Sequence, residues 1–160
     1  MKSRKLSLVS SSEKKTIAIG RTLSRFLKKG DTVALCGDLG SGKTTFVKGL
    51  AQGLEIRQKI NSPSFVILKL YKGKKILQHF DLYRMNSVEE IEGIGFEEFL
   101  LDDAISVIEW ADKVESLLPQ EYLRINILTQ VNNKRILKFT SFGLRYNLIL
   151  SKLKNISSKC

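Results

Sequence analysis

Apolar and polar positions alternate in several short runs of the chain, and each run is bounded by glycine, proline, asparagine or serine. This pattern is typical of β-strands in a packed sheet. The runs that predict strands are 5–9, 32–36, 65–71, 75–80, 104–108, 122–128 and 135–140. Two pairs of runs are separated by short turns, one centred on Gly73 and one on Asn132-Asn133. Both pairs are therefore predicted to be hairpins.

Between these runs the apolar positions recur with helical spacing. Ser10 and Glu13 have the spacing of a capping box, which predicts that a helix begins there. Its apolar face continues to Gly30 through Ile19, Leu23, Phe26 and Leu27. Further helices are predicted over 45–54, over the acidic stretch 87–101 with interruptions at glycines 93 and 95, and over 144–153.

Helices that alternate with strands predict an α/β fold: a three-layer domain with a mixed parallel and antiparallel central sheet. A length of 160 residues, 42% of them hydrophobic, suits a single domain over 1–160 with its core at about 5–153. No apolar run approaches the ~20 residues of a membrane span, and the first residues lack the apolar core of a signal peptide. We therefore expect a cytoplasmic protein without membrane contact.

The cysteine and histidine content limits the chemistry. Cys36 lies in an apolar run and is expected to be a core residue, while Cys160 ends the sequence, so neither predicts a disulfide. The single histidine, His79, has no neighbouring soft ligands, which argues against a structural zinc site. We assign it no catalytic role, because we expect a single histidine to be packed or hydrogen-bonded within the fold and not to act as a general base.

Charge is distributed unevenly along the chain. Residues 81–115 hold 11 of the 16 acidic residues and 2 of the 27 basic residues, so one acidic segment stands in a basic protein. A basic surface attracts polyanions such as RNA at a distance, and the acidic segment could face a basic partner. General lysine enrichment explains the same numbers, and the two interpretations remain open.

The sequence Gly37-Asp-Leu-Gly-Ser-Gly-Lys-Thr44 has the form of a P-loop. Its glycines allow backbone amides to surround phosphate groups, and the predicted strand before it and helix after it stand where this mechanism needs them. A chance glycine-rich turn would not require that context. We therefore expect the three-layer α/β domain to be P-loop NTPase-like and its ligand to be ATP with Mg²⁺. The predicted contacts are the backbone of Gly40, Ser41 and Gly42, the Lys43 ammonium on the β and γ phosphates, the Thr44 hydroxyl on Mg²⁺, and Thr45 on phosphate.

P-loop enzymes usually place a carboxylate on a neighbouring strand to organise the metal, and two candidates stand at strand ends. Glu109 follows the apolar run 104–108 in the manner of a Walker B strand, and Asp81 follows 75–80. We favour Glu109 as a metal ligand and Asp81 as the residue that positions water, although either acid could cap the next segment instead. Trp110 could stack near the nucleotide or belong to the core.

Absent motifs narrow the class of P-loop protein. The guanine-specific pattern Asn-Lys-x-Asp is missing, since Asn133-Lys134 continues with Arg135-Ile136, and so is the signature of ABC transporters. The alternatives to an ATPase that remain are a small-molecule kinase and a nucleotide-dependent binding switch.

Five blocks in a fixed order resemble the bacterial TsaE family. They are Gly37-Asp-Leu-Gly-Ser-Gly-Lys-Thr-Thr45, Asn61-Ser-Pro-Ser-Phe65, His79-Phe-Asp-Leu-Tyr-Arg84, Glu89-Glu-Ile-Glu-Gly-Ile-Gly-Phe96, and Ile108-Glu-Trp110 followed by Leu118-Pro119. The resemblance implies an ATPase of tRNA threonylcarbamoyladenosine (t6A) synthesis. It would work with two partner proteins, the threonylcarbamoyl transferase and its paralogue, and would not perform the transfer itself. Contact with tRNA would be indirect or weakly electrostatic.

The resemblance also implies roles for individual residues. It supports Thr44 and Glu109 on Mg²⁺, Asp81 in hydrolysis, and Trp110 near the nucleotide. It places Ser12, Glu13 and Lys134 near adenine. Where the family usually has Ser-Pro-Thr, this chain has Ser62-Pro63-Ser64, which retains the hydroxyl at Ser64 for sensing the γ-phosphate.

Overall fold

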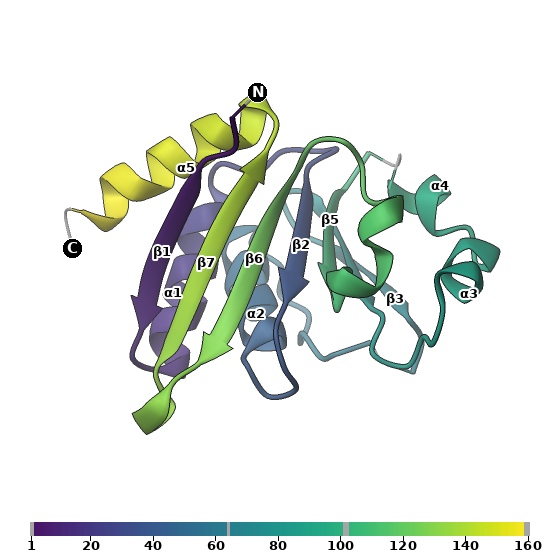
Figure 1. Ribbon diagram of the computed structural model, residues 1–160, viewed down its shortest axis with the longest axis horizontal. Coiled ribbons are helices and arrows are strands. Elements are labelled where there is room, and N and C mark those ends of the chain that lie inside the picture. Colours follow the sequence, from purple (N-terminus) through teal and green to yellow (C-terminus); the bar gives the residue numbers. More distant parts are fainter. Residues whose placement is uncertain (1, 64, 101–102, 159–160) are drawn as a thin grey trace.

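A single mixed sheet forms the centre of the protein. The computed structural model describes residues 2–63, 65–100 and 103–158. Seven strands lie in the order β1-β7-β6-β2-β5-β4-β3 (Figure 1). The strands are β1 Lys5–Ser10, β2 Thr32–Cys36, β3 Leu68–Lys72, β4 Ile76–Asp81, β5 Ile105–Glu109, β6 Tyr122–Thr129 and β7 Arg135–Phe142. Strand β2 pairs in parallel with β5 and β6, and β4 pairs in parallel with β5. The other pairings are antiparallel, so the predicted mixed sheet is confirmed.

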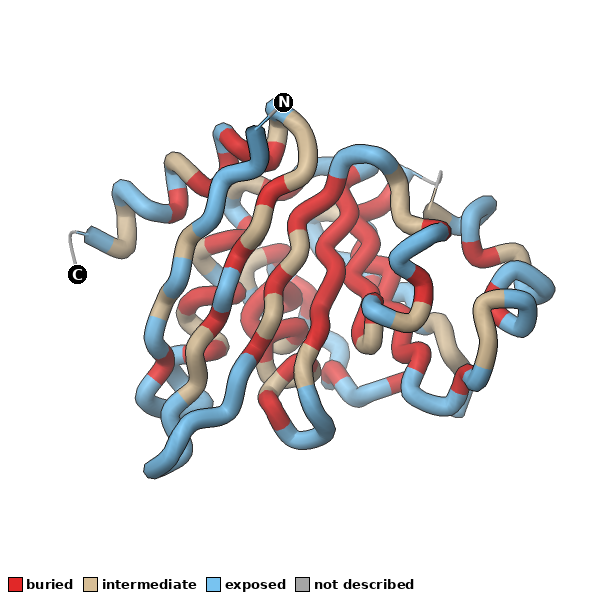
Figure 2. Tube along the Cα trace, viewed as in Figure 1, coloured by how far each residue is buried: buried red, intermediate tan, exposed pale blue. Residues whose placement is uncertain are grey.

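Helices cover both faces of this sheet, which gives the three predicted layers. The helices α1 Glu13–Ser24, α2 Lys43–Gly53 and α5 Leu144–Ser157 share one apolar core with one face. On the other face, α3 Val88–Gly93, α4 Phe96–Leu100 and the 3-10 helix η1 Ala111–Leu117 form a second apolar cluster, mainly with β2, β5 and β4. A second 3-10 turn, η2 Val131–Asn133, joins β6 to β7. Figure 2 shows the most continuous burial along β2 and β5.

Two glycines allow α1 and α2 to touch along their backbones. A Cβ atom on Gly49 would lie 2.2 Å from the carbonyl oxygen of Ile17, and one on Gly20 would lie 2.5 Å from that of Phe46. Any side chain at these positions would push the helices apart. Because α2 carries the P-loop at its start, this contact helps to fix the loop relative to α1.

Several boundaries differ from the predictions by a few residues, and three of these differences have a clear local cause. Ser10 does not cap α1: the Ser12 hydroxyl accepts from the Lys15 amide at 3.1 Å, while the Ser10 hydroxyl lies 2.7 Å from that of Thr16. Helix α1 ends at Ser24 because tighter turns follow it. The strand predicted from residue 65 begins only at Leu68, since the amides of residues 66 and 67 both donate to the Pro63 carbonyl.

A forked ion pair ties α5 to the start of β2. Arg145 Nε donates to Asp31 Oδ1 at 2.6 Å, and its Nη2 donates to Asp31 Oδ2 at 2.5 Å. The Asp31 side chain is almost fully buried, and its Oδ2 also accepts from the amide of Lys28 at 2.7 Å.

Among the helices described, none has the length and apolar character needed to cross a membrane.

Candidate nucleotide-binding site

The P-loop connects the central strand β2 to the first turn of α2. Gly37, Gly40 and Gly42 all have positive φ, at 147°, 76° and 105°. A Cβ atom on Gly37 would also lie 2.5 Å from the carbonyl oxygen of Ile127. Gly42 is the N-cap of α2 and has no side chain to pair with the first helical amides. These amides therefore keep their hydrogen-bonding capacity for an anion, as a phosphate site requires.

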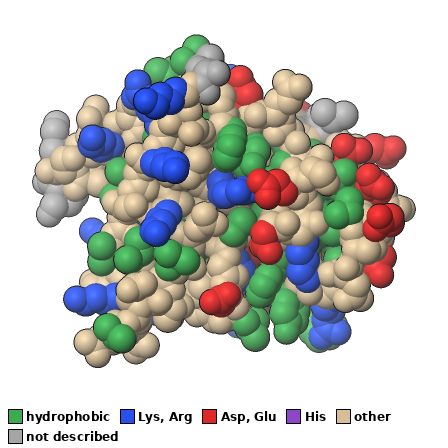
Figure 3. Space-filling view, viewed as in Figure 1, with side chains coloured by type: hydrophobic (Ala, Val, Ile, Leu, Met, Phe, Trp, Pro, Cys, Tyr) green, Lys and Arg blue, Asp and Glu red, His purple; other side chains and the backbone are tan. Residues whose placement is uncertain are grey.

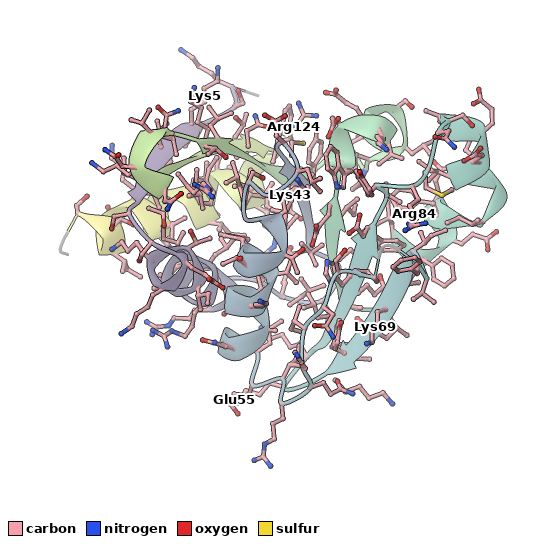
Figure 4. All side chains as sticks on the ribbon, turned by 90° about the horizontal axis from the view of Figure 1, so that it is seen from below. Lys5, Lys43, Glu55, Lys69, Arg84 and Arg124 are labelled. Carbon is pink, nitrogen blue, oxygen red and sulfur yellow. The ribbon has the colours of Figure 1, made fainter. Side chains whose placement is uncertain are left out.

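The ammonium group of Lys43 lies against this loop (Figure 4). Only 5% of the residue is exposed, and its Nζ donates to the carbonyl oxygens of Gly37 at 2.6 Å and Asp38 at 2.9 Å. Burial lowers the pKa of the Lys43 ammonium, and the negative charges of Glu109 and Asp81 oppose this effect. A phosphate beside Nζ would favour the charged form further.

Adjacent strands bring the two predicted carboxylates to one edge of the sheet. Asp81 ends β4 and Glu109 ends β5, and the two residues are register partners in a parallel pair. Both are buried. The hydroxyl of Thr44 donates to Glu109 Oε1 at 2.8 Å, so the two predicted metal ligands are in direct contact.

His79 also contacts Glu109, which the sequence analysis did not foresee. Its Nε2 lies 2.8 Å from Glu109 Oε1, and the imidazole is fully buried. Among the described residues its Nδ1 has no hydrogen-bond partner. His79 and Asp81 are two positions apart on one strand and therefore share a face, which is the sequence signal that could have placed His79 here.

Asp81 is held by two groups from neighbouring loops. The hydroxyl of Ser62 donates to Asp81 Oδ2, and the amide of Tyr83 donates to Oδ1 at 3.0 Å. Ser62 belongs to the segment predicted to sense the γ-phosphate, so this segment is in contact with the acid predicted to act in hydrolysis. Ser64 lies outside the described residues, and its role stays a prediction.

Trp110 forms part of the wall of the site. Its ring centroid lies 4.0 Å from Lys43 Nζ and 5.2 Å from the ring of Tyr83. Its φ of 61° is unusual for a bulky residue, so the chain after Glu109 is held in a strained conformation. The ring also packs against the apolar cluster under η1, as the core interpretation expects. Stacking of Trp110 near a nucleotide stays a prediction.

Two pockets meet at the P-loop. One, of about 350 Å³, is lined by Leu39, Gly40, Gly42, Lys43, Thr44, Thr45, Ser62, Asp81, Tyr83, Glu109 and Trp110. The other, of about 430 Å³, is lined by Ser11, Ser12, Glu13, Thr16, Gly40, Ser41, Gly42, Thr45, Asn133 and Arg135. The first gathers the predicted phosphate and metal residues. The second brings Ser12 and Glu13 to the same loop, since both pockets share Gly40, Gly42 and Thr45.

Lys134 is exposed and does not line the second pocket, whereas its neighbours Asn133 and Arg135 do. Arg135 Nε donates to the carbonyl oxygen of Ser41 at 2.9 Å, and its Nη2 donates to that of Gly40 at 3.3 Å. Arg135 thus anchors the P-loop to the hairpin of β6 and β7. Sequence reasoning missed it, because only the placement of β6 beside β2 brings this hairpin to the loop.

The donors in the first pocket suit a magnesium ion that is shared with phosphate. Thr44 and Glu109 offer hard oxygen ligands 2.8 Å apart, beside the buried carboxylate of Asp81. Within the described ranges, no group of three or more His, Cys, Asp or Glu side chains could hold a metal alone. Mg²⁺ commonly binds through one or two protein oxygens together with phosphate and water, so this donor set fits it.

Comparison with known proteins identifies the family. Residues 10–137 match the family described as Threonylcarbamoyl adenosine biosynthesis protein TsaE. The chain belongs to the TsaE family. It is 43% identical over 147 residues to the tRNA threonylcarbamoyladenosine biosynthesis protein TsaE of Bacillus subtilis, a match that covers 89% of this chain and 92% of that protein. It is 40% identical over 127 residues to the protein of the same name from Treponema pallidum, covering 79% and 94%.

A solved structure has the same fold as this TsaE-family chain. The crystal structure of Bacillus subtilis YdiB superposes with a TM-score of 0.85 at 34% sequence identity, and the match covers 98% of this chain and 99% of that one. The predicted resemblance to the TsaE family is therefore confirmed. The matched range, residues 10–137, includes every residue that lines the two pockets.

Proposed function

We propose that this TsaE-family chain is an ATPase that binds ATP with Mg²⁺ and, with two partner proteins, supports formation of t6A in tRNA. The observation that carries the proposal is the contact of Thr44 with Glu109 in the pocket that the buried Lys43 also lines. A strand-end acid that touches the P-loop threonine has the arrangement of a Walker site, in which both oxygens face the β and γ phosphates. The names of the relatives supply the pathway.

Each residue of the first pocket takes one task in this proposal. The amides from Gly40 to Thr45 and the Lys43 ammonium hold the phosphates, and Thr44 with Glu109 holds Mg²⁺. The ion, when bound, neutralises charge that develops on the phosphates. Asp81 orients the attacking water, and its bonds from Ser62 and Tyr83 fix the carboxylate for that task.

Hydrolysis by the isolated chain should be slow. Lys43 is the only cationic residue that lines the first pocket within the described part of the chain, and no arginine is present there. Charge on the transferred phosphoryl group would therefore lack a second cation until a partner completes the site. The two partners are the transferase that modifies tRNA and its paralogue. Contact of this chain with tRNA is indirect or weakly electrostatic.

The test is a reconstituted tRNA modification reaction. Unmodified tRNA, ATP, threonine, bicarbonate and the remaining proteins of t6A synthesis are incubated with this chain, without it, or with the Asp81→Asn variant. Nucleosides from digested tRNA are then quantified. We expect sustained t6A formation only with the unaltered chain. Equal amounts of t6A in all three reactions would contradict the proposal.

A further inference from the structure

Strand β1 is an edge of the sheet with one side unpaired. It is the first strand in the order, and β7 is its only partner strand among the residues described. The register sets Lys5 opposite Thr140, and the neighbouring Ser141 amide donates to the Arg4 carbonyl at 3.0 Å. Since hydrogen-bonded pairs alternate along an antiparallel ladder, Lys5, Ser7 and Val9 turn their amide and carbonyl groups away from β7. These groups form a template for another strand.

An apolar groove runs beside this free edge. It has a volume of about 340 Å³ and lies between β1, α1 and the last turns of α5. Figure 1 shows that α5 extends past the edge of the sheet at β1. The apolar part of its wall is made by Leu8, Val9, Ala18, Ile19, Leu153 and Ile156. A strand added to β1 would turn every second side chain toward α1 and α5, and therefore into this groove.

The elements around the groove are basic. Apart from Arg145, which pairs with Asp31, they carry Lys5, Lys14, Lys15, Arg21, Lys152 and Lys154, and their one acidic residue is Glu13. None of these six bases forms an ion pair with an acidic residue in the described ranges. Lys15 lines the groove itself. On the face of the sheet opposite α1 and α2, Figure 3 shows basic side chains over the β1 and β7 side and acidic ones over α3 and α4.

We propose that β1 and this groove form a docking site for an extended, acidic segment of a partner protein. The segment adds to the sheet as a strand, places apolar side chains in the groove at alternate positions, and sets acidic side chains near Lys5 and Lys15. The free edge of β1 supplies backbone hydrogen bonds, and the groove supplies apolar contact. The basic side chains without an acidic partner favour a segment that carries negative charge. The proposal rests on the proposed function in one respect: the segment belongs to one of the two partners in t6A synthesis.

The decisive variant is Ser7→Pro, because the Ser7 amide points away from β7. Proline at an edge strand leaves the pairing with β7 intact but removes an outward donor and places ring atoms where the added strand would lie. Ser7→Ala is the matched control, since it keeps the amide. A second pair tests charge: Lys15→Glu in the groove against Lys69→Glu, an exposed lysine on β3 at the opposite edge of the sheet (Figure 4).

Binding to a mixture of the two purified partner proteins is measured with immobilised variants, and binding of an ATP analogue is measured separately as a check on folding. We expect Ser7→Pro to weaken partner binding by about tenfold or more and Lys15→Glu by about threefold to tenfold, with both controls near the unaltered chain and nucleotide binding unchanged throughout. Unchanged partner binding by Ser7→Pro and Lys15→Glu would overturn the docking site alone. If the unaltered chain binds neither partner, both this inference and the proposed function fail.

Discussion

The contact between His79 and Glu109 leads to a prediction about metal binding. Replacing His79 with leucine removes the Nε2 donor 2.8 Å from Glu109 Oε1 and fills the space with an apolar group. Replacing it with glutamine keeps an amide donor at a similar reach. Because Glu109 is only 3% exposed, water cannot readily replace the lost donor. Thr44 would remain as the described side-chain donor to that oxygen.

The size of the effect expected for His79→Leu follows from the burial of both His79 and Glu109. A hydrogen bond to a buried charged group contributes about 1.5–3 kcal/mol, so His79→Leu should lower the free energy of unfolding by that amount. Removing a partner that orients a metal ligand commonly weakens metal binding by about 10–100-fold. Affinity for nucleotide without Mg²⁺ should change little, since we propose that Lys43 and the loop amides hold the phosphates. The loss should therefore appear mainly in the dependence on Mg²⁺.

The assay is a Mg²⁺ titration of nucleotide binding, followed by the fluorescence of Trp110, the single tryptophan, whose ring lies beside Lys43. Urea unfolding gives the stability of each variant. We expect His79→Leu to need much more Mg²⁺ than the unaltered chain and His79→Gln to recover most of the difference. If His79→Leu is destabilised but its Mg²⁺ dependence is unchanged, His79 supports the fold and does not orient Glu109.

Three further predictions concern single side chains. Lys43→Ala should weaken ATP binding, whereas Asp81→Asn should bind ATP nearly as well and lose turnover, because the proposed partner of Lys43 is phosphate in both the ground state and the transition state. Equal losses of affinity by calorimetry would mean that Asp81 is misassigned. Arg145→Met should lower the free energy of unfolding in urea by about 3 kcal/mol, because the buried Asp31 carboxylate loses its forked partner, and Arg145→Lys should lower it less. Unchanged stability in both variants would refute this view of the ion pair. Burial raises the pKa of the Cys36 thiol. In a Cys160→Ser background, Cys36 should therefore react with a thiol reagent far more slowly at pH 8 than the free amino acid does, and faster as pH rises or after unfolding. Rapid labelling of the folded protein would contradict its burial.

Periodicity and turn residues were sufficient for the main elements of the fold. Every predicted strand is present, because alternation and bounding turns act locally, and the P-loop stands between β2 and α2 as its mechanism needs. The capping residue of α1 could not be chosen in the same way. Ser10 and Ser12 are both suitable, and the choice depends on the direction in which β1 delivers the chain, which is a property of the sheet.

The site shows the same division between local and long-range information. Asp81 and Glu109 could be found from their positions at strand ends. However, the sequence alone does not show that Asp81 and Glu109 are neighbours, or that His79 contacts Glu109. Both facts depend on the position of β4 directly beside β5. Arg135 reaches Gly40 and Ser41 only because β6 pairs with β2 and β7 follows it, which no local pattern reveals.

The central claim is that this chain hydrolyses ATP under the control of its partners. The most direct measurement is the rate of inorganic phosphate release from ATP labelled at the γ position, for the chain alone and after addition of both partner proteins. We predict a low rate alone, a rate at least several-fold higher with both partners, and no increase when Asp81→Asn replaces the unaltered chain. A rate that the partners leave unchanged, or label that passes to an acceptor other than water, would contradict the account.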